Sequence, residues 1–301
     1  MTHLDFTDRC VIVTGAGRGL GRSYARLLGS RGAMVVVNDL GAALDGSPTG
    51  EDPTAQVAET INAAGGRAVA STDDVATTEG AQSIIDTAMA QFGRIDAVIN
   101  NAGVYSARPW TDISVAAYQK FLDVHFFGSL LVSRAAWPHL VAAGQGRIVN
   151  TVSITAFGAP DMLHYGAAKG AVLGLTRNLA VAGADHGIAV NAVAPGAATR
   201  MTDASATALP QGTVELVKQT MPPELVAPVV AYLAHPACPV TGEVLNAAGG
   251  GVSRLVIGTT TGIVDTNLTP EVVAQRFDEI MAVGHVEPIQ LMRPEPSQGL
   301  K

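Results

Sequence analysis

Short apolar runs alternate with stretches of helical composition along most of the chain. Helical stretches include Glu79–Gln91 and Val115–Ala136. Strands that alternate with helices in this way predict an α/β fold, with a doubly wound parallel β-sheet and helices on both faces. The runs expected to form buried strands are Val11–Val13, Ala33–Val37, Arg67–Ala70, Ala97–Asn100, Arg147–Thr151, Ala189–Val193 and Glu243–Asn246.

Three regions depart from this alternation. Residues 41–54 are rich in Gly, Ser, Pro and Asp and read as a surface loop, and residues 197–223 show little periodicity. In residues 252–301, Thr269 suits a helix N-cap and Pro270 the first helical position. We therefore expect a main domain at 1–251 and a C-terminal extension at 252–301, packed on the same or a neighbouring subunit. An apolar stripe at helical spacing follows the N-cap, at Val272, Val273, Phe277, Ile280 and Met281.

A glycine-rich run follows the first predicted strand. It reads Thr14-Gly15-Ala16-Gly17-Arg18-Gly19-Leu20-Gly21 and leads into a predicted helix. Gly15 permits the tight turn, and Gly19 and Gly21 permit close approach of backbone and ligand. The N–H groups at the helix N-terminus then face the pyrophosphate. Strand, turn and helix together predict a Rossmann-type dinucleotide site, for which the alternative is a tight loop that binds nothing.

An acidic residue ends the second predicted strand. Asp39 lies about 20 residues beyond the glycine run, where an acid bonds the adenosine ribose hydroxyls. Its charge repels a 2′-phosphate, which favours NAD over NADP. Arg18 points the other way, because a guanidinium can pair with such a phosphate, unless it is an ordinary solvated charge. We give Asp39 the greater weight because it acts at the ribose directly, so NAD is the expected cofactor.

A tyrosine and a lysine lie one helical turn apart, at Tyr165 and Lys169. Residues i and i+4 share a helix face. A free tyrosine has a pKa of about 10, and a close cation lowers that pKa and makes the phenol a usable acid or base. Ser153, just past a predicted strand, supplies a hydroxyl that can hold a carbonyl or alcohol oxygen. A solvated helix face would show the same spacing, so the predicted nucleotide site gives the pair its meaning.

Together these motifs resemble the short-chain dehydrogenase/reductase family over roughly residues 6–251. The resemblance rests on the glycine run, Asp74-Val75, Asn100-Asn101-Ala102-Gly103, Ser153, Tyr165 with Lys169, and Pro195-Gly196. It implies hydride transfer between a CH–OH carbon and the nicotinamide, with Tyr165 as the acid/base and Ser153 holding the substrate oxygen. Lys169 would lower the pKa of Tyr165 and bond the nicotinamide ribose.

The same resemblance implies the cofactor contacts. Asp74 and Val75 would face the adenine, Asn101 to Gly103 the adenosine side, and Pro195-Gly196 with Thr199 the nicotinamide amide. The family also places a mobile substrate lid at 197–223. The full expected cofactor set is Gly15, Arg18, Gly19, Leu20, Asp39, Asp74, Val75, Asn101, Ala102, Gly103, Tyr165, Lys169, Pro195, Gly196 and Thr199.

Within the family, the chain looks like the (3R)-hydroxyacyl-CoA dehydrogenase domain of peroxisomal multifunctional enzymes and its bacterial relatives, in runs such as Val37–Gly41 and Val124–Ser129. This favours a 3-hydroxyacyl-CoA substrate. The alternatives are a hydroxysteroid or another secondary alcohol, and a non-catalytic NAD-binding regulatory protein. His125 stands where many members place an asparagine relay, and it either acts through a water or fills the core. Ser153 lies one residue nearer Tyr165 than is common in the family.

Composition and charge narrow the partners. Hydrophobic residues make up 48% of the chain and charged residues 15%, which suits a well-buried sheet. The net charge of −7 argues against nucleic acid and anionic membranes. Cys10 and Cys238 read as reduced thiols, no stretch can span a bilayer, and no cluster has metal-site spacing. We therefore expect a cytoplasmic protein without a metal, and the resemblance adds a homodimer or homotetramer.

Overall fold

The computed structural model describes residues 4–204 and 212–292. The chain forms two compact units, Met1–Ser253 and Arg254–Lys301, and each is described by itself. Part of the predicted lid, residues 205–211, lies outside the described residues.

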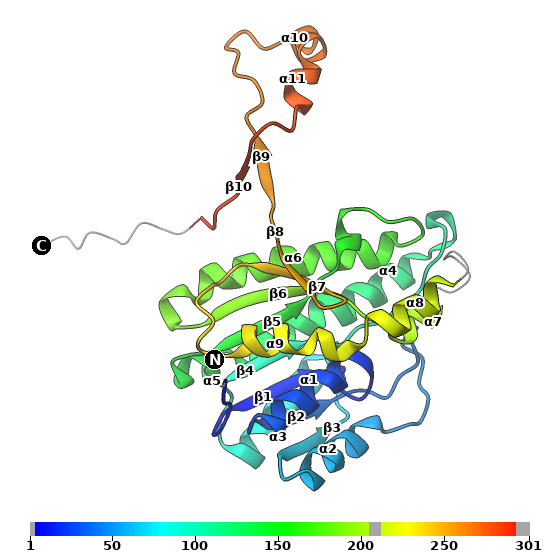
Figure 1. Cartoon of the computed structure of the whole chain (residues 1–301), viewed down its shortest axis with the longest axis vertical. Helices are drawn as coiled ribbons and strands as arrows, with labels where there is room; N and C mark the ends of the chain where they lie inside the picture. Colours follow the sequence, from blue (N-terminus) through cyan, green and yellow to red (C-terminus); the bar gives the residue numbers. More distant parts are fainter. Residues whose placement is uncertain (1–3, 205–211, 293–301) are drawn as a thin grey trace, which may run out of the picture. The chain divides into compact units, whose positions relative to one another are not determined.

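The first unit is built on an eight-stranded sheet in the order β3-β2-β1-β4-β5-β6-β7-β8 (Figure 1). Neighbouring strands from β3 to β7 pair in parallel, and the chain changes direction across the sheet between β1 and β4. In such sheets ligands bind at this switch point, beyond the carboxyl ends of the strands. The strands are β1 Cys10–Thr14, β2 Met34–Asn38, β3 Arg67–Ser71, β4 Ala97–Asn100, β5 Arg147–Thr151, β6 Ala189–Gly196, β7 Val244–Ala248 and β8 Gly251–Leu255.

Helices cover both faces of the sheet, which confirms the predicted doubly wound α/β fold. On one face α1 packs against α2 and α9, and on the other α3 packs against α5, with α4 against α6 (Figure 1). Short 3₁₀ turns lie at Trp110–Asp112, Ile154–Phe157, Ala184–His186 and Pro223–Leu225. The helices are α1 Gly19–Ser30, α2 Pro53–Ala63, α3 Thr78–Phe92, α4 Val115–Leu122, α5 Gly128–Ala143, α6 Leu163–Gly183, α7 Arg200–Ala204, α8 Thr213–Thr220 and α9 Ala227–Ala234.

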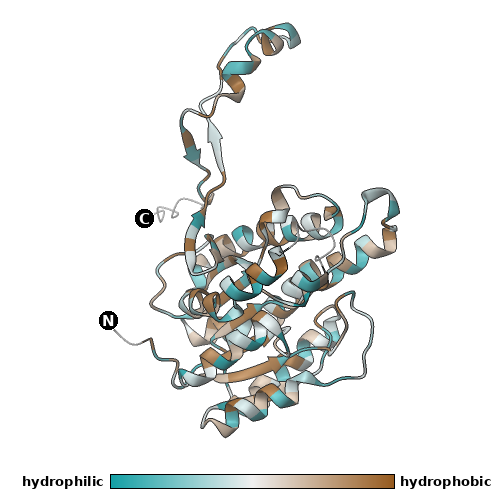
Figure 2. Ribbon diagram, turned by 45° about the vertical axis from the view of Figure 1, so that its right-hand side comes forward, coloured by the Kyte–Doolittle hydropathy of each residue, from teal (hydrophilic) through white to brown (hydrophobic). Residues whose placement is uncertain are grey.

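The central strands are buried along their whole length. Every residue of β1, β2, β4 and β5 is buried. Figure 2 shows hydrophobic strand segments, in brown, between the helices of this unit. A parallel sheet covered on both faces needs apolar side chains on both sides of each strand. That is why these strands appear in the sequence as continuous apolar runs rather than as alternating patterns.

The predicted helix over Val115–Ala136 is not continuous. A π-helical turn, Asp123–Phe127, separates α4 from α5, and α5 runs on to Ala143 with Pro138 inside it. Such a turn adds one residue to the helix. The hydrophobic period over a few residues is too coarse to reveal that extra residue.

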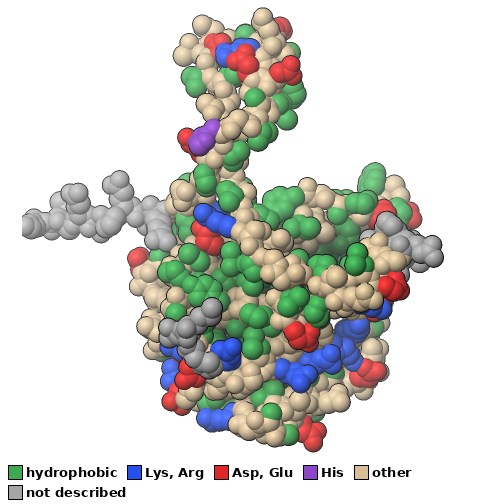
Figure 3. Space-filling model, in the orientation of Figure 1, with side chains coloured by type: hydrophobic (Ala, Val, Ile, Leu, Met, Phe, Trp, Pro, Cys, Tyr) green, Lys and Arg blue, Asp and Glu red, His purple; other side chains and the backbone are tan. Residues whose placement is uncertain are grey.

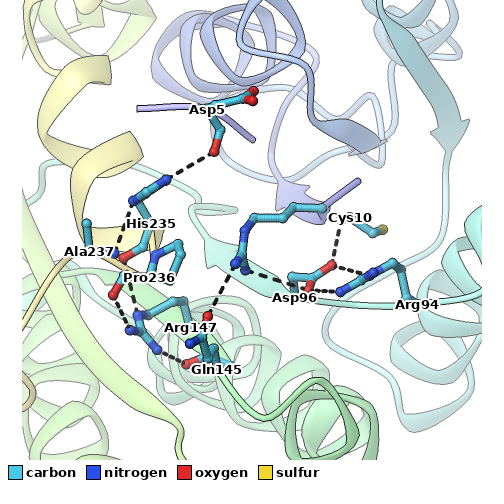
Figure 4. A network of polar contacts seen from close by, with 11 residues as sticks. Asp5, Cys10, Arg94, Asp96, Gln145, Arg147, His235, Pro236 and Ala237 are labelled. Atoms are coloured by element: carbon cyan, nitrogen blue, oxygen red, sulfur yellow. Dashed lines mark hydrogen bonds and ion pairs between the residues drawn. The ribbon is translucent and has the colours of Figure 1, made fainter. Parts of the chain in front are cut away.

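Charged side chains join the strands at their amino ends, opposite the ligand edge (Figure 4). The Asp96 carboxylate accepts hydrogen bonds from Cys10 N (2.8 Å) and from Arg94 Nε (2.8 Å). The buried Arg147 guanidinium donates to the carbonyl oxygens of Gly146 (2.9 Å) and Pro236 (2.9 Å). Charges are rarely buried without partners, and here each group is satisfied. The network fixes the starts of β1, β4 and β5.

The second unit has a small sheet of its own. Strand β9, Gly258–Thr260, pairs antiparallel with β10, Val286–Pro288. The predicted cap is confirmed, because Thr269 Oγ1 accepts a hydrogen bond from Val272 N (3.3 Å) at the start of α10, Pro270–Gln275. The expected helical stripe continues into a separate short helix, α11, Phe277–Met281.

Candidate active site

The glycine-rich turn leads directly from β1 into α1. Gly15 and Gly19 adopt positive φ values of 63° and 52°, which other residues rarely adopt. Arg18 is the N-cap of α1, but its side chain makes no capping hydrogen bond, and no acidic residue lies in the first turn. The first N–H groups of a helix have no partner within it. Those of α1 therefore point to a ligand, and a phosphate suits them in charge.

Close backbone contacts hold this turn in shape. A Cβ atom on Gly21 would lie 2.2 Å from Gly15 O, and one on Gly17 would lie 2.4 Å from Pro53 Cγ. The Asn101 side-chain amide donates to Thr14 O (3.0 Å) and to Gly15 O (3.0 Å). Thus Asn101, which was expected on the adenosine side, uses its amide to brace the glycine turn.

Two carboxylates follow the ends of β2 and β3. The Asp39 carboxylate accepts from Gly17 N (3.0 Å) through Oδ2 and from Gly41 N (2.8 Å) through Oδ1. Asp74 Oδ1 accepts from Ala76 N (2.9 Å), and the adjoining Val75 is buried. Backbone N–H donors thus fix both acids at the edge of the sheet where the glycine turn lies.

A cavity of about 1060 Å³ runs along this edge. Figure 3 shows Lys and Arg side chains gathered beside α1, and the arginines that line the cavity are Arg18, Arg22 and Arg200. Its shape, the open helix N-terminus and the glycine turn fit a dinucleotide. The expected cofactor residues that line it are Gly15, Arg18, Gly19, Leu20, Asp39, Asp74, Val75, Asn101, Ala102, Gly103 and Thr199.

The remaining expected residues do not line this cavity. Pro195 and Gly196 close β6, where they pair with β7. A Cβ on Gly196 would lie 2.8 Å from Ala248 Cβ, so the lack of a side chain lets the two strands approach. Thr199, in the next loop, does line the cavity, and its Oγ1 accepts a hydrogen bond from Met201 N (3.2 Å). Ser153, Tyr165 and Lys169 lie beyond the cavity lining.

The structure brings the serine, tyrosine and lysine together. Tyr165 and Lys169 lie on α6, with Lys169 Nζ 5.6 Å from the centroid of the Tyr165 ring. Lys169 Nζ also donates to Thr151 O at the end of β5 (2.7 Å). Ser153 follows β5, and its Oγ accepts from Thr155 N (3.2 Å) and Thr155 Oγ1 (2.9 Å). Thr155 therefore orients the serine, a role that the sequence did not reveal.

Burial dominates the electrostatics of this cluster. It raises the pKa of Tyr165 to about 12, although a hydrogen bond with Ser153 lowers it. It also lowers the pKa of Lys169 to about 7. The shift of Tyr165 runs opposite to the expected direction, because the phenol loses solvation when it is buried and the Lys169 charge does not offset that loss.

An apolar layer covers Tyr165. Tyr165 packs in a cluster with Val104 and Phe121, and Tyr105 and Met162 pack against the cluster. The Tyr105 ring stands at 73° to the Tyr165 ring, with centroids 6.0 Å apart. Sequence reasoning did not identify Tyr105, and no motif marks it.

Two histidines lie near the tyrosine. His125, in the π-helical turn, is buried, and its ring centroid lies 5.3 Å from that of Tyr165. Burial lowers the pKa of His125 well below 6.5. His164 forms a hydrogen bond to Ser106 Oγ (2.7 Å) through Nε2 and packs against Phe121.

Among residues 4–204 and 212–292, no group of three or more His, Cys, Asp or Glu side chains is arranged to hold a metal ion. In the same ranges, no helix is long and apolar enough to cross a membrane.

Comparison with known proteins agrees with this geometry. A model of the short chain dehydrogenase family matches residues 9–210. A short-chain type dehydrogenase/reductase of Mycobacterium tuberculosis is 42% identical over 91% of this chain and 94% of its own length. Peroxisomal multifunctional enzyme type 2 of Mus musculus is 39% identical over 92% of this chain, and the match spans 37% of that enzyme. A solved 7α-hydroxysteroid dehydrogenase, in complex with NADH and 7-oxo glycochenodeoxycholic acid, has a TM-score of 0.72 and 29% identity, covering 83% of this chain and 96% of that one.

The family match covers most of the sheet and both halves of the site. It confirms the resemblance drawn from the glycine run, the serine and the tyrosine–lysine pair. Members of this family use nicotinamide cofactors, and the cavity at the glycine turn fits one. The chain belongs to the short-chain dehydrogenase/reductase family and is an oxidoreductase acting on CH–OH groups.

Proposed function

We propose that the protein is an NAD-dependent dehydrogenase that transfers a hydride between a secondary alcohol and NAD, with a 3-hydroxyacyl-CoA as the substrate. The Asp39 carboxylate, held by two backbone N–H groups beside the glycine turn, carries the choice of NAD. Such an acid accepts hydrogen bonds from ribose hydroxyls and repels a 2′-phosphate. The substrate class is supported by the likeness to the multifunctional enzyme over 92% of this chain.

The proposed reaction divides the work between cofactor and protein. When bound, the nicotinamide is the group that accepts the hydride in oxidation or donates it in reduction. Ser153 holds the substrate oxygen. Tyr165 gives a proton to that oxygen in reduction and takes one from it in oxidation. With a pKa of about 12, Tyr165 carries its proton at neutral pH and is ready to act as the acid in reduction. In oxidation it must accept a proton as the phenolate, and a charged Lys169 lowers the free energy of that form.

Three large apolar side chains are exposed and are candidates for lining the substrate cleft. Trp110, Phe157 and Leu163 are 70%, 59% and 50% exposed, although they are large and hydrophobic. They suit an acyl chain, and they equally suit a steroid. The 7α-hydroxysteroid dehydrogenase, which matches 83% of this chain, makes a hydroxysteroid the second candidate.

The test is NADH formation by the purified protein with (3R)- and (3S)-3-hydroxyacyl-CoA thioesters, hydroxysteroids and simple secondary alcohols. We expect the highest kcat/KM with a 3-hydroxyacyl-CoA. A steroid turned over with the higher kcat/KM would overturn the substrate assignment while leaving the enzyme class intact. Inactivity with every alcohol, together with intact NAD binding, would favour the non-catalytic regulatory alternative.

Assembly and location are part of the same proposal. By family resemblance we expect a homodimer or homotetramer built from the helices at 115–136 and 165–182, in the cytoplasm, with residues 252–301 packed on the same or a neighbouring subunit. Light scattering of the eluted protein measures the mass. A monomer would contradict the assembly without touching the proposed reaction.

A further inference from the structure

An ion pair lies beside the glycine turn. Glu51, in the loop that follows Asp39, pairs with Arg18 of the glycine turn, and both side chains line the cavity. The Arg18 side chain is 23% exposed and the Glu51 side chain 66%. Sequence reasoning placed Glu51 in an ordinary surface loop, because no motif marks an acid at that position.

The loop backbone fixes where Glu51 stands. A Cβ on Gly41 would lie 1.9 Å from Glu51 O, so the chain at Glu51 passes directly over Gly41. Gly41 N in turn donates to Asp39 Oδ1 (2.8 Å). On its other side Glu51 precedes Asp52, the N-cap of α2, which accepts from Thr54 N (2.9 Å). The backbone at Glu51 therefore packs against the turn that carries Asp39, and these contacts fix the position of Glu51.

Four charged side chains meet at this end of the cavity. Arg18, Arg200, Asp39 and Glu51 all line it. Burial and the charge of Arg18 lower the pKa of Arg200, while Asp39 and Glu51 raise it. The four groups are thus close enough to affect one another. Within this group of four, two carboxylates balance two guanidinium groups.

Arg18 still has a donor to offer. Its Nη2 is taken by Glu51, whereas its Nη1 is buried and has no hydrogen-bond partner among the described residues. A buried donor without a partner costs free energy unless a ligand satisfies it. A neutral hydroxyl oxygen can accept from Nη1. Arginine binds a phosphate dianion most strongly through two parallel N–H groups, and Glu51 already occupies one arm of Arg18.

We propose that Glu51 is a specificity-determining residue that excludes NADP by occupying Arg18. The inference rests on the proposed binding of a nicotinamide dinucleotide at the glycine turn and extends it to a residue beyond Asp39. Glu51 acts through Arg18, because it neutralises the guanidinium that would otherwise attract a 2′-phosphate.

The test compares equilibrium binding of NAD⁺ and NADP⁺ by calorimetry, which does not depend on turnover. In Glu51→Gln we expect the affinity for NADP⁺ relative to NAD⁺ to rise about tenfold, equivalent to about 1.4 kcal/mol. The gain should shrink at high salt, because screening weakens interactions between exposed charges. Glu59→Gln, an exposed acid on α2 outside the cavity lining, is the matched control and should leave the ratio unchanged.

A second variant shows whether Arg18 transmits the effect. Adding Arg18→Met to Glu51→Gln should abolish the gain, because the guanidinium that Glu51 had occupied is then absent. An unchanged ratio in Glu51→Gln, or a gain that survives Arg18→Met, would overturn the inference. Preference of the wild-type protein for NADP⁺ would overturn the proposed cofactor itself, so the two failures are distinguishable. If Glu51→Gln does not fold, Glu51→Ala takes its place, with the same expected rise in relative NADP⁺ affinity and the same loss of that rise when Arg18→Met is added.

Discussion

The ring of His125 stands at 89° to the ring of Tyr165, with centroids 5.3 Å apart. His125 Nε2 lies 2.9 Å from Val104 O, and its Nδ1 has no hydrogen-bond partner in the described part of the chain. The imidazole therefore packs against the phenol ring in a T-shaped arrangement within the core. It also retains one polar atom that burial leaves unpaired.

We expect the free energy of unfolding to fall as the pH drops below about 6.5. Burial keeps the pKa of His125 well below that value, so the folded protein holds a neutral ring while the unfolded chain takes up a proton. The contribution of this ring to the free energy of unfolding is complete above pH 6.5 and falls below it, by up to about 1.4 kcal/mol per pH unit. Urea unfolding of wild type and His125→Phe at pH values from about 5 to 8 measures the difference. Identical pH slopes for the two proteins would contradict the expectation.

Replacing Tyr165 with phenylalanine should remove the proton donor and keep the ring. We expect turnover to fall by a factor of about 10² to 10⁴ or more. NAD⁺ affinity and the melting temperature should change little, because the packing against Tyr105 and His125 remains. Steady-state rates and calorimetry check both parts. Tyr118→Phe, whose ring packs on His164, is the control. Turnover retained in Tyr165→Phe would remove this tyrosine from the mechanism.

Lys169 should make stability rise with pH in the alkaline range. Burial lowers its pKa from 10.5 to about 7, so between these values the unfolded chain binds a proton that the folded protein lacks. The wild type should therefore gain up to about 1.4 kcal/mol per pH unit relative to Lys169→Met between about pH 7 and 9. Lys218→Met is the control, because Lys218 pairs with Asp203 and its pKa is raised. Parallel curves for wild type and Lys169→Met would show that the amine is charged in the folded state.

The glycine turn should tolerate no side chain at Gly21. A Cβ there would lie 2.2 Å from Gly15 O and 2.6 Å from Asn101 Nδ2, so the turn must move. We expect Gly21→Ala to lose about 1–3 kcal/mol of stability and to bind NAD⁺ at least about tenfold more weakly. Gly284→Ala, where a Cβ would meet nothing within 4 Å, should behave as wild type. Undiminished affinity in Gly21→Ala would mean that the cofactor does not use this turn.

The sequence predicted the fold well where burial is complete. β4 and β5 were expected at the residues where they occur, because a covered parallel strand leaves an uninterrupted apolar run. β9 and β10 were missed, since three-residue strands with exposed side chains leave no pattern. The separation of α10 from α11 was missed for a similar reason, because the apolar spacing continues across the break at Arg276.

The candidate site was predictable as far as motifs mark it. The pairing of Tyr165 with Lys169 follows from helix geometry, and Ser153 follows from the end of a strand. The pKa of Tyr165 did not follow, because it depends on burial beneath residues distant in sequence, such as Tyr105. Glu51 escaped notice as well, since only the folded loop brings it to Arg18.

The π-helical turn at Asp123–Phe127 determines which side of α5 faces the sheet. Each residue of an α-helix turns the chain by about 100°. Asn100 Nδ2 donates to Ser133 Oγ (2.9 Å) and Ser129 O (3.3 Å), so α5 meets the sheet in one orientation only. Deleting one residue from the turn would straighten the helix and rotate those acceptors away from Asn100. In an alignment of relatives, a one-residue gap at this place would therefore mark chains in which a different side of α5 faces the sheet, even where the flanking residues agree.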